Sequence, residues 1–257
     1  MIIRKSAQEI EKMASAGSIV ADTIAHVGEQ LEPGITTGEL DRLADEFIAA
    51  RGGVPTSKGY RGYPKAICIS PNAMVVHGIP GAYVVRDGDL VTIDVGVTLD
   101  GYIADSAFTF GVGELPAASQ RLLDVGREAL AAGIAEARPG NRVGDISAAV
   151  QAVVESNRFS VVRSLVGHGV GRSYHEDPHI PNFGERGRGP QLSEGMTLAI
   201  EPMITAGGAG VYVHDDDWSI STEDGSLACH FEHTVAITAA GPRLLTGAGD
   251  REPSLLK

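Results

Sequence analysis

The chain has 257 residues, a formal net charge of −12 and a sequence pI near 5.1. It has no Lys/Arg cluster of the kind that binds nucleic acid, no apolar segment typical of a signal peptide and no apolar run of membrane-spanning length. Its two cysteines, Cys68 and Cys229, lack zinc-like spacing, so we expect reduced thiols in a cytoplasmic protein.

Two pairs of amphipathic helices are expected along the chain. Ser6 and Glu9 form a capping box before apolar residues at helical spacing, which predicts a helix over about residues 7–29. A second capping box predicts a helix that ends at Arg51-Gly52-Gly53. The other pair is expected over about residues 116–137 and 143–155.

The stretch between the helix pairs predicts a β-hairpin. Apolar residues alternate from Val91 to Leu99, and Asp100-Gly101 supplies a two-residue turn. This register places Gly96 opposite Asp105, so Asp94 and Asp105 become diagonal neighbours on one face, roughly 7 Å apart at the backbone. Two carboxylates this close repel unless a proton or cation lies between them. The alternative is an ordinary solvated acidic pair on an edge hairpin.

A weak internal repeat relates the two halves of the chain. PGITTGEL at 33–40 aligns with PGNRVGDI at 139–146, and DGDLVTID at 87–94 aligns with EGMTLAIE at 194–201. The second alignment matches Asp94 with Glu201. We therefore expect one α+β domain over residues 1–257, in which a curved antiparallel sheet is backed by two pairs of helices. Its pseudo-two-fold halves span about residues 1–110 and 111–257.

Further candidate metal ligands lie in the second half. Glu201 and Glu232 stand in apolar, strand-like runs without an evident cationic partner, and His168 is flanked by glycines that permit close backbone approach. Together with the hairpin acids they form a set of four carboxylates and one imidazole. Such a set can neutralise two divalent ions and suits Mn, Fe, Co or Zn better than Ca. Two adjacent ions of this kind make a hydrolytic site.

Seven short motifs, in order, resemble those of type I methionine aminopeptidase over residues 3–247. They are NAMVVHGIP (72–80), IDV (93–95), ADS (104–106), GHGVG (167–171), HEDP (175–178), IEPM (200–203) and FEHT (231–234). The resemblance implies the pita-bread fold and an enzyme that removes the initiator methionine when the second residue is small.

The resemblance also implies roles for individual residues. It implies two divalent ions, with Asp94 on one, His168 and Glu201 on the other, and Asp105 and Glu232 bridging them. Hydroxide held between the ions would attack the first peptide bond. Glu201 would serve as general base and acid, His175 would stabilise the oxyanion, and His77 would contact the substrate near the scissile amide. Taken singly, His77 and His175 also fit an ordinary surface or core histidine.

A methionine pocket is expected to be narrow, mostly apolar and rich in polarizable or aromatic groups. Each aromatic residue alone also fits simple core packing. By resemblance, the residues that bind the substrate are Tyr60, Tyr63, Cys68, His77, Tyr174, His175 and Trp218.

Two other functions are compatible with the same fold. A proline-directed aminopeptidase shares the metal-ligand pattern but usually carries an extra N-terminal domain, whereas this chain opens directly with the expected catalytic fold. A non-catalytic pita-bread binding module would have lost ligands, and all five are present here.

The resemblance further implies a monomer that acts on nascent chains, and in some relatives a monovalent cation near the residue equivalent to Asn72. In many bacterial relatives the hairpin before the equivalent tryptophan is basic, which implies docking on the ribosome through that hairpin. The acidic stretch 214–225 argues against docking through that hairpin here, because ribosomal RNA phosphates would repel it.

Overall fold

A computed structural model describes residues 2–247 of the chain, so Met1 and the last ten residues of the expected 1–257 domain lie outside the described residues. The four expected helices are present. The capping box of Ser6 and Glu9 begins the first of them, with the Ser6 hydroxyl accepting the Glu9 N–H and the Glu9 carboxylate accepting the Ser6 N–H. The helices are α1 (Ala7–Glu29), α2 (Thr37–Ala50), α3 (Ala117–Glu136) and α4 (Val143–Ser156).

Short strands and one 3₁₀ turn make up the rest of the fold. They are β1 (Val54–Pro55), η1 (Tyr60–Gly62), β2 (Cys68–Pro71), β3 (Met74–Val76), β4 (Leu90–Leu99), β5 (Tyr102–Gly111), β6 (Ser160–Val161), β7 (Val166–Gly169), β8 (Glu176–Pro181), β9 (Thr197–Ile200), β10 (Met203–Thr205), β11 (Val211–Val213), β12 (Ile220–Thr222), β13 (Ala228–His230), β14 (His233–Thr238) and β15 (Gly241–Leu244).

The hairpin of β4 and β5 has the predicted register. Leu99 pairs with Tyr102, and Gly96 pairs with Asp105. Asp100 and Gly101 both have positive φ, as the two-residue turn requires. The sheet around this hairpin is less continuous than the sequence predicted. Among the described residues the strands form four hydrogen-bonded sheets, ordered β1-β4-β2 with β5 on β4, β13-β10-β6, β11-β12-β3, and β15-β14-β9-β7-β8.

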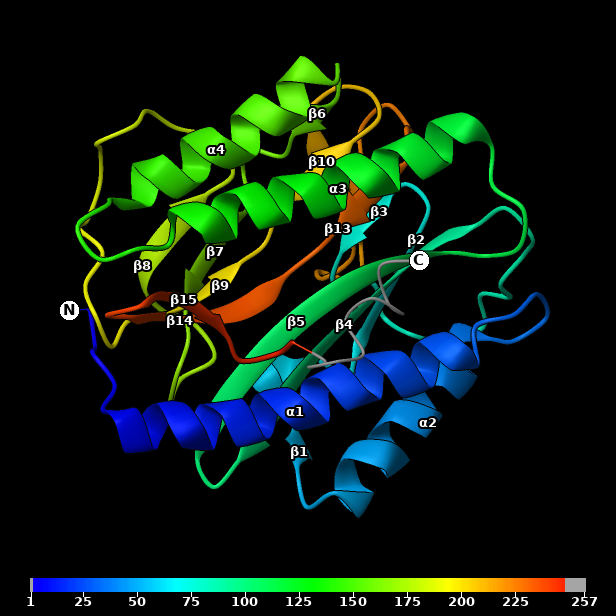
Figure 1. Cartoon of the computed structure of the whole chain (residues 1–257). Helices are drawn as coiled ribbons and strands as arrows, with labels where there is room; N and C mark the ends of the chain where they lie inside the picture. Colours follow the sequence, from blue (N-terminus) through cyan, green and yellow to red (C-terminus); the bar gives the residue numbers. More distant parts are fainter. Residues whose placement is uncertain (1, 248–257) are drawn as a thin grey trace.

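Two helix pairs enclose the strands from opposite sides. Figure 1 shows α1 and α2 (blue) below β4 and β5, and α3 and α4 (green) above the strands of the second half. Each side has its own apolar core, one containing Val20, Leu40 and Ile93, the other Leu122, Ile146 and Leu198. Within residues 2–247, none of the helices is both long and apolar enough to cross a membrane.

The internal repeat corresponds to equivalent structure. The first repeated segment ends in the start of α2, and its counterpart ends in the start of α4. An isolated antiparallel bridge joins Thr36 to Val84 in the first half, and a matching bridge joins Arg142 to Gln191 in the second. The carboxylate-bearing strands of the two halves therefore face each other across the middle of the molecule.

Candidate metal centre and substrate pocket

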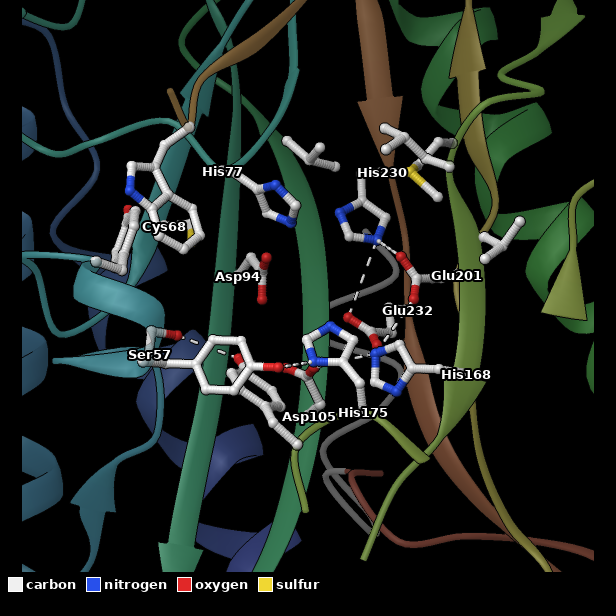
Figure 2. Close-up of a pocket in the computed structure, with 18 of the residues that line it drawn as sticks. Ser57, Cys68, His77, Asp94, Asp105, His168, His175, Glu201, His230 and Glu232 are labelled. Carbon is white, nitrogen blue, oxygen red and sulfur yellow. Dashed lines mark hydrogen bonds and ion pairs between the residues drawn. The ribbon is translucent and has the colours of Figure 1, made fainter. Parts of the chain in front are cut away.

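A cavity of about 280 Å³ lies where the two halves meet (Figure 2). Every residue that we predicted as a metal ligand, catalytic group or substrate contact lines this cavity. These residues are Tyr60, Tyr63, Cys68, His77, Asp94, Asp105, His168, Tyr174, His175, Glu201, Trp218 and Glu232. Sequence reasoning did not identify several others, namely Arg61, Val76, Ser164, Leu165, Val166, Met203 and His230.

The five candidate ligands come from both halves of the fold. Asp94 and Asp105 project from the two strands of the central hairpin, and His168 stands in β7. Glu201 directly follows β9, and Glu232 lies between β13 and β14. The glycines beside His168 permit this convergence, since a Cβ on Gly167 would lie 2.5 Å from the Ala199 carbonyl oxygen.

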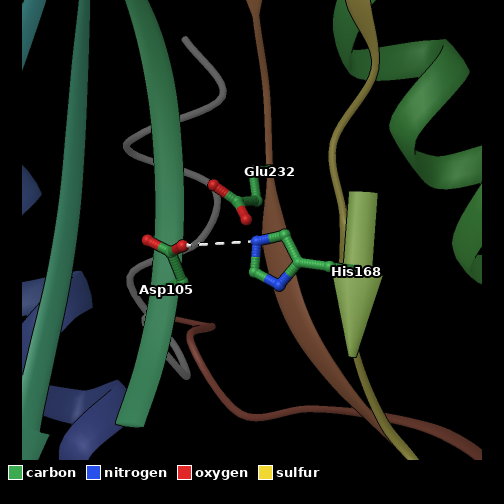
Figure 3. Close-up of side chains that lie close together, drawn as sticks. All are labelled: Asp105, His168 and Glu232. Atoms are coloured by element: carbon green, nitrogen blue, oxygen red, sulfur yellow. Dashed lines mark ion pairs between the residues drawn. The ribbon is translucent and has the colours of Figure 1, made fainter. Parts of the chain in front are cut away.

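The ligand atoms lie close enough to surround a common ion. One atom each from Asp105, His168 and Glu232 falls within 4.8 Å of the other two, and Figure 3 shows the three side chains converging. The His168 Nε2 atom is 4.0 Å from Oδ2 of Asp105 and 3.5 Å from Oε1 of Glu201. These distances are longer than a typical hydrogen bond, and a cation placed between the atoms could be coordinated by all of them.

Electrostatics make this cluster costly without a cation. Burial raises the pKa of the Asp94 carboxyl to about 7. Burial, with the repulsion of neighbouring carboxylates, raises the pKa values of Asp105, Glu201 and Glu232 well above their usual range. Burial also lowers the pKa of His168 to about 3, which keeps that imidazole neutral and able to ligate.

The donor set fits divalent metal ions. Among the described residues, the ion pairs of these carboxylates are with His168 or His230 and none is with a Lys or Arg side chain. The Oε1 atom of Glu232 is buried without a hydrogen-bond partner. Hard carboxylate oxygens with one neutral imidazole are ligands that divalent transition ions accept.

Two further histidines face the cavity from opposite sides. The Nδ1 atom of His175 is 2.9 Å from the Tyr60 hydroxyl, and its ring centroid is 4.2 Å from that of His168. His77 has a left-handed backbone, with φ of 58°. Burial lowers the pKa of His77 to about 4, so its side chain is neutral. A partly buried, non-glycine residue held at positive φ is a strained arrangement typical of functional sites.

One end of the cavity is walled by aromatic rings and a thiol. Tyr63 and Trp218 meet edge to face, with ring centroids 5.0 Å apart. The Tyr63 hydroxyl donates to the carbonyl of Gly78, 2.8 Å away, which fixes its ring. Burial raises the pKa of the Cys68 thiol well above its usual range, so the sulfur is uncharged. This wall offers a polarizable, largely apolar surface.

Tyr174 differs from the other predicted pocket residues. Its hydroxyl donates to Oδ1 of Asp105 at 3.4 Å and lies 3.1 Å from the Ser57 hydroxyl. Because a phenol has one proton, Ser57 must be the donor in the second contact. Gly96 makes room for the Tyr174 side chain, since a Cβ at position 96 would lie 2.3 Å from the Tyr174 oxygen. Tyr174 therefore orients a candidate ligand as well as bordering the pocket.

Asn72, where the resemblance implied a monovalent cation, lies outside the cavity wall. Its side-chain amide donates to Asp89 at 2.9 Å and to the Tyr83 hydroxyl at 3.1 Å, while its side-chain oxygen accepts the N–H of Leu90. Any cation there would have to rely on other oxygen atoms.

Comparison with known proteins places this geometry in a family. The model of metallopeptidase family M24 matches residues 11–239. A methionine aminopeptidase of Clostridium perfringens is 50% identical over 246 residues, covering 96% of this chain and 99% of that protein. The crystal structure of a methionine aminopeptidase from Thermotoga maritima superposes with a TM-score of 0.94 at 45% identity, covering 96% of this chain and 99% of that one.

A more distant likeness is informative about the fold alone. A prolidase from Pyrococcus furiosus has a TM-score of 0.73 at 23% identity, and the match covers 95% of this chain but 65% of that one. The predicted α+β pita-bread architecture is confirmed by these structural matches. The chain belongs to metallopeptidase family M24 and, within it, to the methionine aminopeptidases.

Proposed function

We propose that this protein is a cytoplasmic, monomeric metalloaminopeptidase that removes the initiator methionine from nascent proteins whose second residue is small. The observation that carries the proposal is the meeting, in one cavity, of a five-ligand cluster with an aromatic wall. The relatives named methionine aminopeptidase support the same activity.

The ligand set would hold two divalent ions, drawn from Mn, Fe, Co or Zn. In this proposal Asp94, Asp105, His168, Glu201 and Glu232 would hold these ions through carboxylate oxygens and one imidazole nitrogen. When bound, such ions acidify water and polarise a carbonyl. Two divalent cations would offset the charge of the four carboxylates and remove the repulsion that, together with burial, raises the pKa values of Asp105, Glu201 and Glu232.

The chain's own residues then handle protons and charge. A carboxylate oxygen of Glu201 accepts the proton of the attacking water and delivers it to the leaving amine. If the Tyr60 hydroxyl donates to Nδ1 of His175, Nε2 keeps its proton and donates to the developing oxyanion. Neutral His77, on the other side of the cavity, hydrogen-bonds the substrate beside the scissile amide.

The aromatic wall supplies selectivity for methionine. An unbranched thioether side chain packs well against Tyr63, Trp218 and the Cys68 sulfur. Steric limits of this kind discriminate between single methylenes by only about 10- to 200-fold. We therefore expect a strong but not absolute preference for methionine over larger first residues of the substrate.

Substrate choice separates this proposal from its two alternatives. A Met-Ala-Ser peptide and an Ala-Pro-Ala peptide are offered to chelator-stripped protein while Mn, Fe, Co or Zn is titrated in. Release of methionine after one or two equivalents of metal supports the proposal. Cleavage of Ala-Pro-Ala alone would indicate a proline-directed peptidase, and cleavage of neither peptide by the metal-loaded protein would indicate a binding module.

The partners in this proposal are nascent chains rather than nucleic acid or membrane. Residues 214–225 include Asp215, Asp216 and Asp217 beside Trp218. This acidic segment would oppose contact with ribosomal RNA, so delivery of substrate would rely on another surface or on diffusion. Co-sedimentation with ribosomes at increasing salt concentration, measured for the wild type and for the triple variant Asp215→Asn, Asp216→Asn, Asp217→Asn, tests this expectation.

A further inference from the structure

His230 is a buried histidine of the cavity whose two ring nitrogens have no hydrogen-bond partner. The residue closes β13 opposite Met203 and is 2% exposed. Its backbone is held firmly, because its N–H donates to the Thr109 hydroxyl and its carbonyl accepts from the same hydroxyl, both at 2.9 Å. A buried imidazole with both nitrogens unsatisfied costs stability, which makes the ring a candidate functional group.

The ring faces the carboxylate that the proposed function makes the proton acceptor. Its Nε2 atom is 3.7 Å from Oε2 of Glu201 and 3.9 Å from Oε2 of Glu232 (Figure 2). The other oxygen of Glu201, Oε1, faces His168 at 3.5 Å. Each of the two oxygens of the Glu201 carboxylate therefore faces a different imidazole.

The protonation of the ring follows from its surroundings. A neutral imidazole carries one N–H, on either of its two ring nitrogens. With metal bound, the Glu201 and Glu232 carboxylates are ionised and only accept hydrogen bonds, which favours that proton on Nε2 and leaves Nδ1 as an acceptor. A shift of less than 1 Å would bring Nε2 and the nearer Glu201 oxygen into hydrogen-bond range.

We propose that His230 is a positioning residue that donates its Nε2–H to Oε2 of Glu201 and fixes the orientation of that carboxylate. The inference rests on the proposed function for the role of Glu201. Fixing Oε2 leaves Oε1 aimed toward His168 and the proposed ion. Groups that orient a metal ligand in this way typically change metal affinity or activity by about 10- to 100-fold when removed.

Three substitutions separate the roles of the two nitrogens. His230→Leu removes both. In His230→Gln the longer side chain brings its amide to the region of Nε2, whereas in His230→Asn the shorter one brings its amide to the region of Nδ1. His26→Leu is the matched control, since His26 stacks on Phe47 between α1 and α2, away from the cavity.

Calorimetric titration of chelator-stripped protein with Mn or Co supplies a readout independent of turnover. We expect His230→Leu to bind the wild-type number of ions, with affinity for one of them lowered by about 10- to 100-fold. In assays with Met-Ala-Ser we expect kcat to fall and KM to stay near the wild-type value. His230→Gln should restore most of both losses, and His230→Asn should not.

Other results would overturn the inference. Loss of a whole equivalent of metal, or of a nitrogen-ligand signature in the Co(II) absorption spectrum, would make His230 a ligand. Rescue by Asn instead of Gln, or unchanged affinity and kcat in His230→Leu, would also contradict it. If His230→Leu does not fold, the Gln and Asn variants still decide. If wild-type protein binds metal but releases no methionine, the proposed function fails, and the three titrations still test His230.

Discussion

The ammonium group of Lys5 lies 2.6 Å from Oε2 of Glu176, and the two side chains are only 4% and 6% exposed. The other oxygen of Glu176 accepts the backbone N–H groups of Arg172 and Ser173. Glu176 thus holds together the turn that carries Tyr174 and His175, and Lys5 neutralises the charge of the Glu176 carboxylate. A residue before the first helix thereby supports one wall of the cavity.

Replacing Lys5 by Met should destabilise the protein strongly, because the Glu176 carboxylate would stay buried without its cation. Breaking such a pair typically costs about 3–5 kcal/mol. Denaturant unfolding measures the change. Arg243→Met is the control, since its pair with Glu11 is largely exposed, and little change is expected there. Equal loss of stability in the two variants would contradict the importance of burial.

Gly96→Ala should disturb the metal centre through Tyr174. The added Cβ would lie 2.3 Å from the Tyr174 oxygen, which must then move away from Asp105. Overpacking of this kind costs about 1–3 kcal/mol, and we expect weaker metal binding as well. Thermal unfolding and calorimetric metal titration check both effects. At Gly81 the nearest atom to a new Cβ is 3.9 Å away, so Gly81→Ala should leave both measurements near wild type.

The stability of the metal-free protein should fall as pH rises above about 6.5. Burial raises the pKa of Asp94 to about 7 in the folded chain, and burial with carboxylate repulsion raises those of Asp105, Glu201 and Glu232 well above their usual range. Between the unfolded and folded pKa of each group the folded state holds more protons, so it loses stability as pH rises. Burial lowers the pKa of His168 to about 3, so this residue makes stability rise with pH, but only up to its unfolded pKa of 6.5. The carboxyls alone then determine the slope that this cluster contributes.

Thermal unfolding of stripped protein at several pH values above 6.5 tests this expectation, and added Mn should raise Tm most at the highest pH. Asp94→Asn should flatten the slope, whereas Glu185→Gln, at an exposed position, should not. A Tm of the stripped protein that climbs with pH in this range would refute the assignment.

His175→Ala should lower kcat by about 10²- to 10³-fold while metal content stays unchanged, because an oxyanion donor acts only in the transition state. Tyr60→Phe, which removes only the group on Nδ1 of His175, should have a smaller effect. Steady-state kinetics with metal analysis of each variant measures both. His179→Ala, in neighbouring β8, is the control. Loss of metal from the His175 variant would identify a ligand instead.

Glu201→Ala should abolish turnover, since it removes a proposed ligand and the proposed proton acceptor together. Metal titration should show weakened binding of one ion at the same time. Glu185→Ala removes an acid from the surface of the same half and should behave as wild type. Near-normal methionine release by the Glu201 variant would exclude the proposed mechanism.

The central hairpin could be predicted because its determinants are local. The alternation from Val91 and the Asp100-Gly101 turn determine the register, and the register determines which acids share a face. The division into four sheets could not be predicted. It depends on strands as short as β1 and β6 and on shifts of register, such as that between His168 and Gly169, which leave no pattern in the sequence.

The roles of two site residues also lay beyond sequence reasoning. The phenol of Tyr174 was expected only in the pocket wall, yet it reaches Asp105 because Gly96 leaves space on the opposite strand. His230 was not predicted at all. A histidine within the run ACHFEHT is compatible with ordinary core packing, and only the folded structure shows that its nitrogens face Glu201 and Glu232.

The carboxyl groups crowded between the two halves have a consequence for local opening. The contact between the halves contains Asp94 and Asp105 from one side and Glu201 and Glu232 from the other, so in stripped protein four carboxyl groups crowd together between the apolar clusters that join the halves. Partial unfolding should then begin at this contact between the two halves. Amide hydrogens of the strands that carry these acids should exchange faster without metal, whereas those of α1 and α3, anchored in their own cores, should keep their protection.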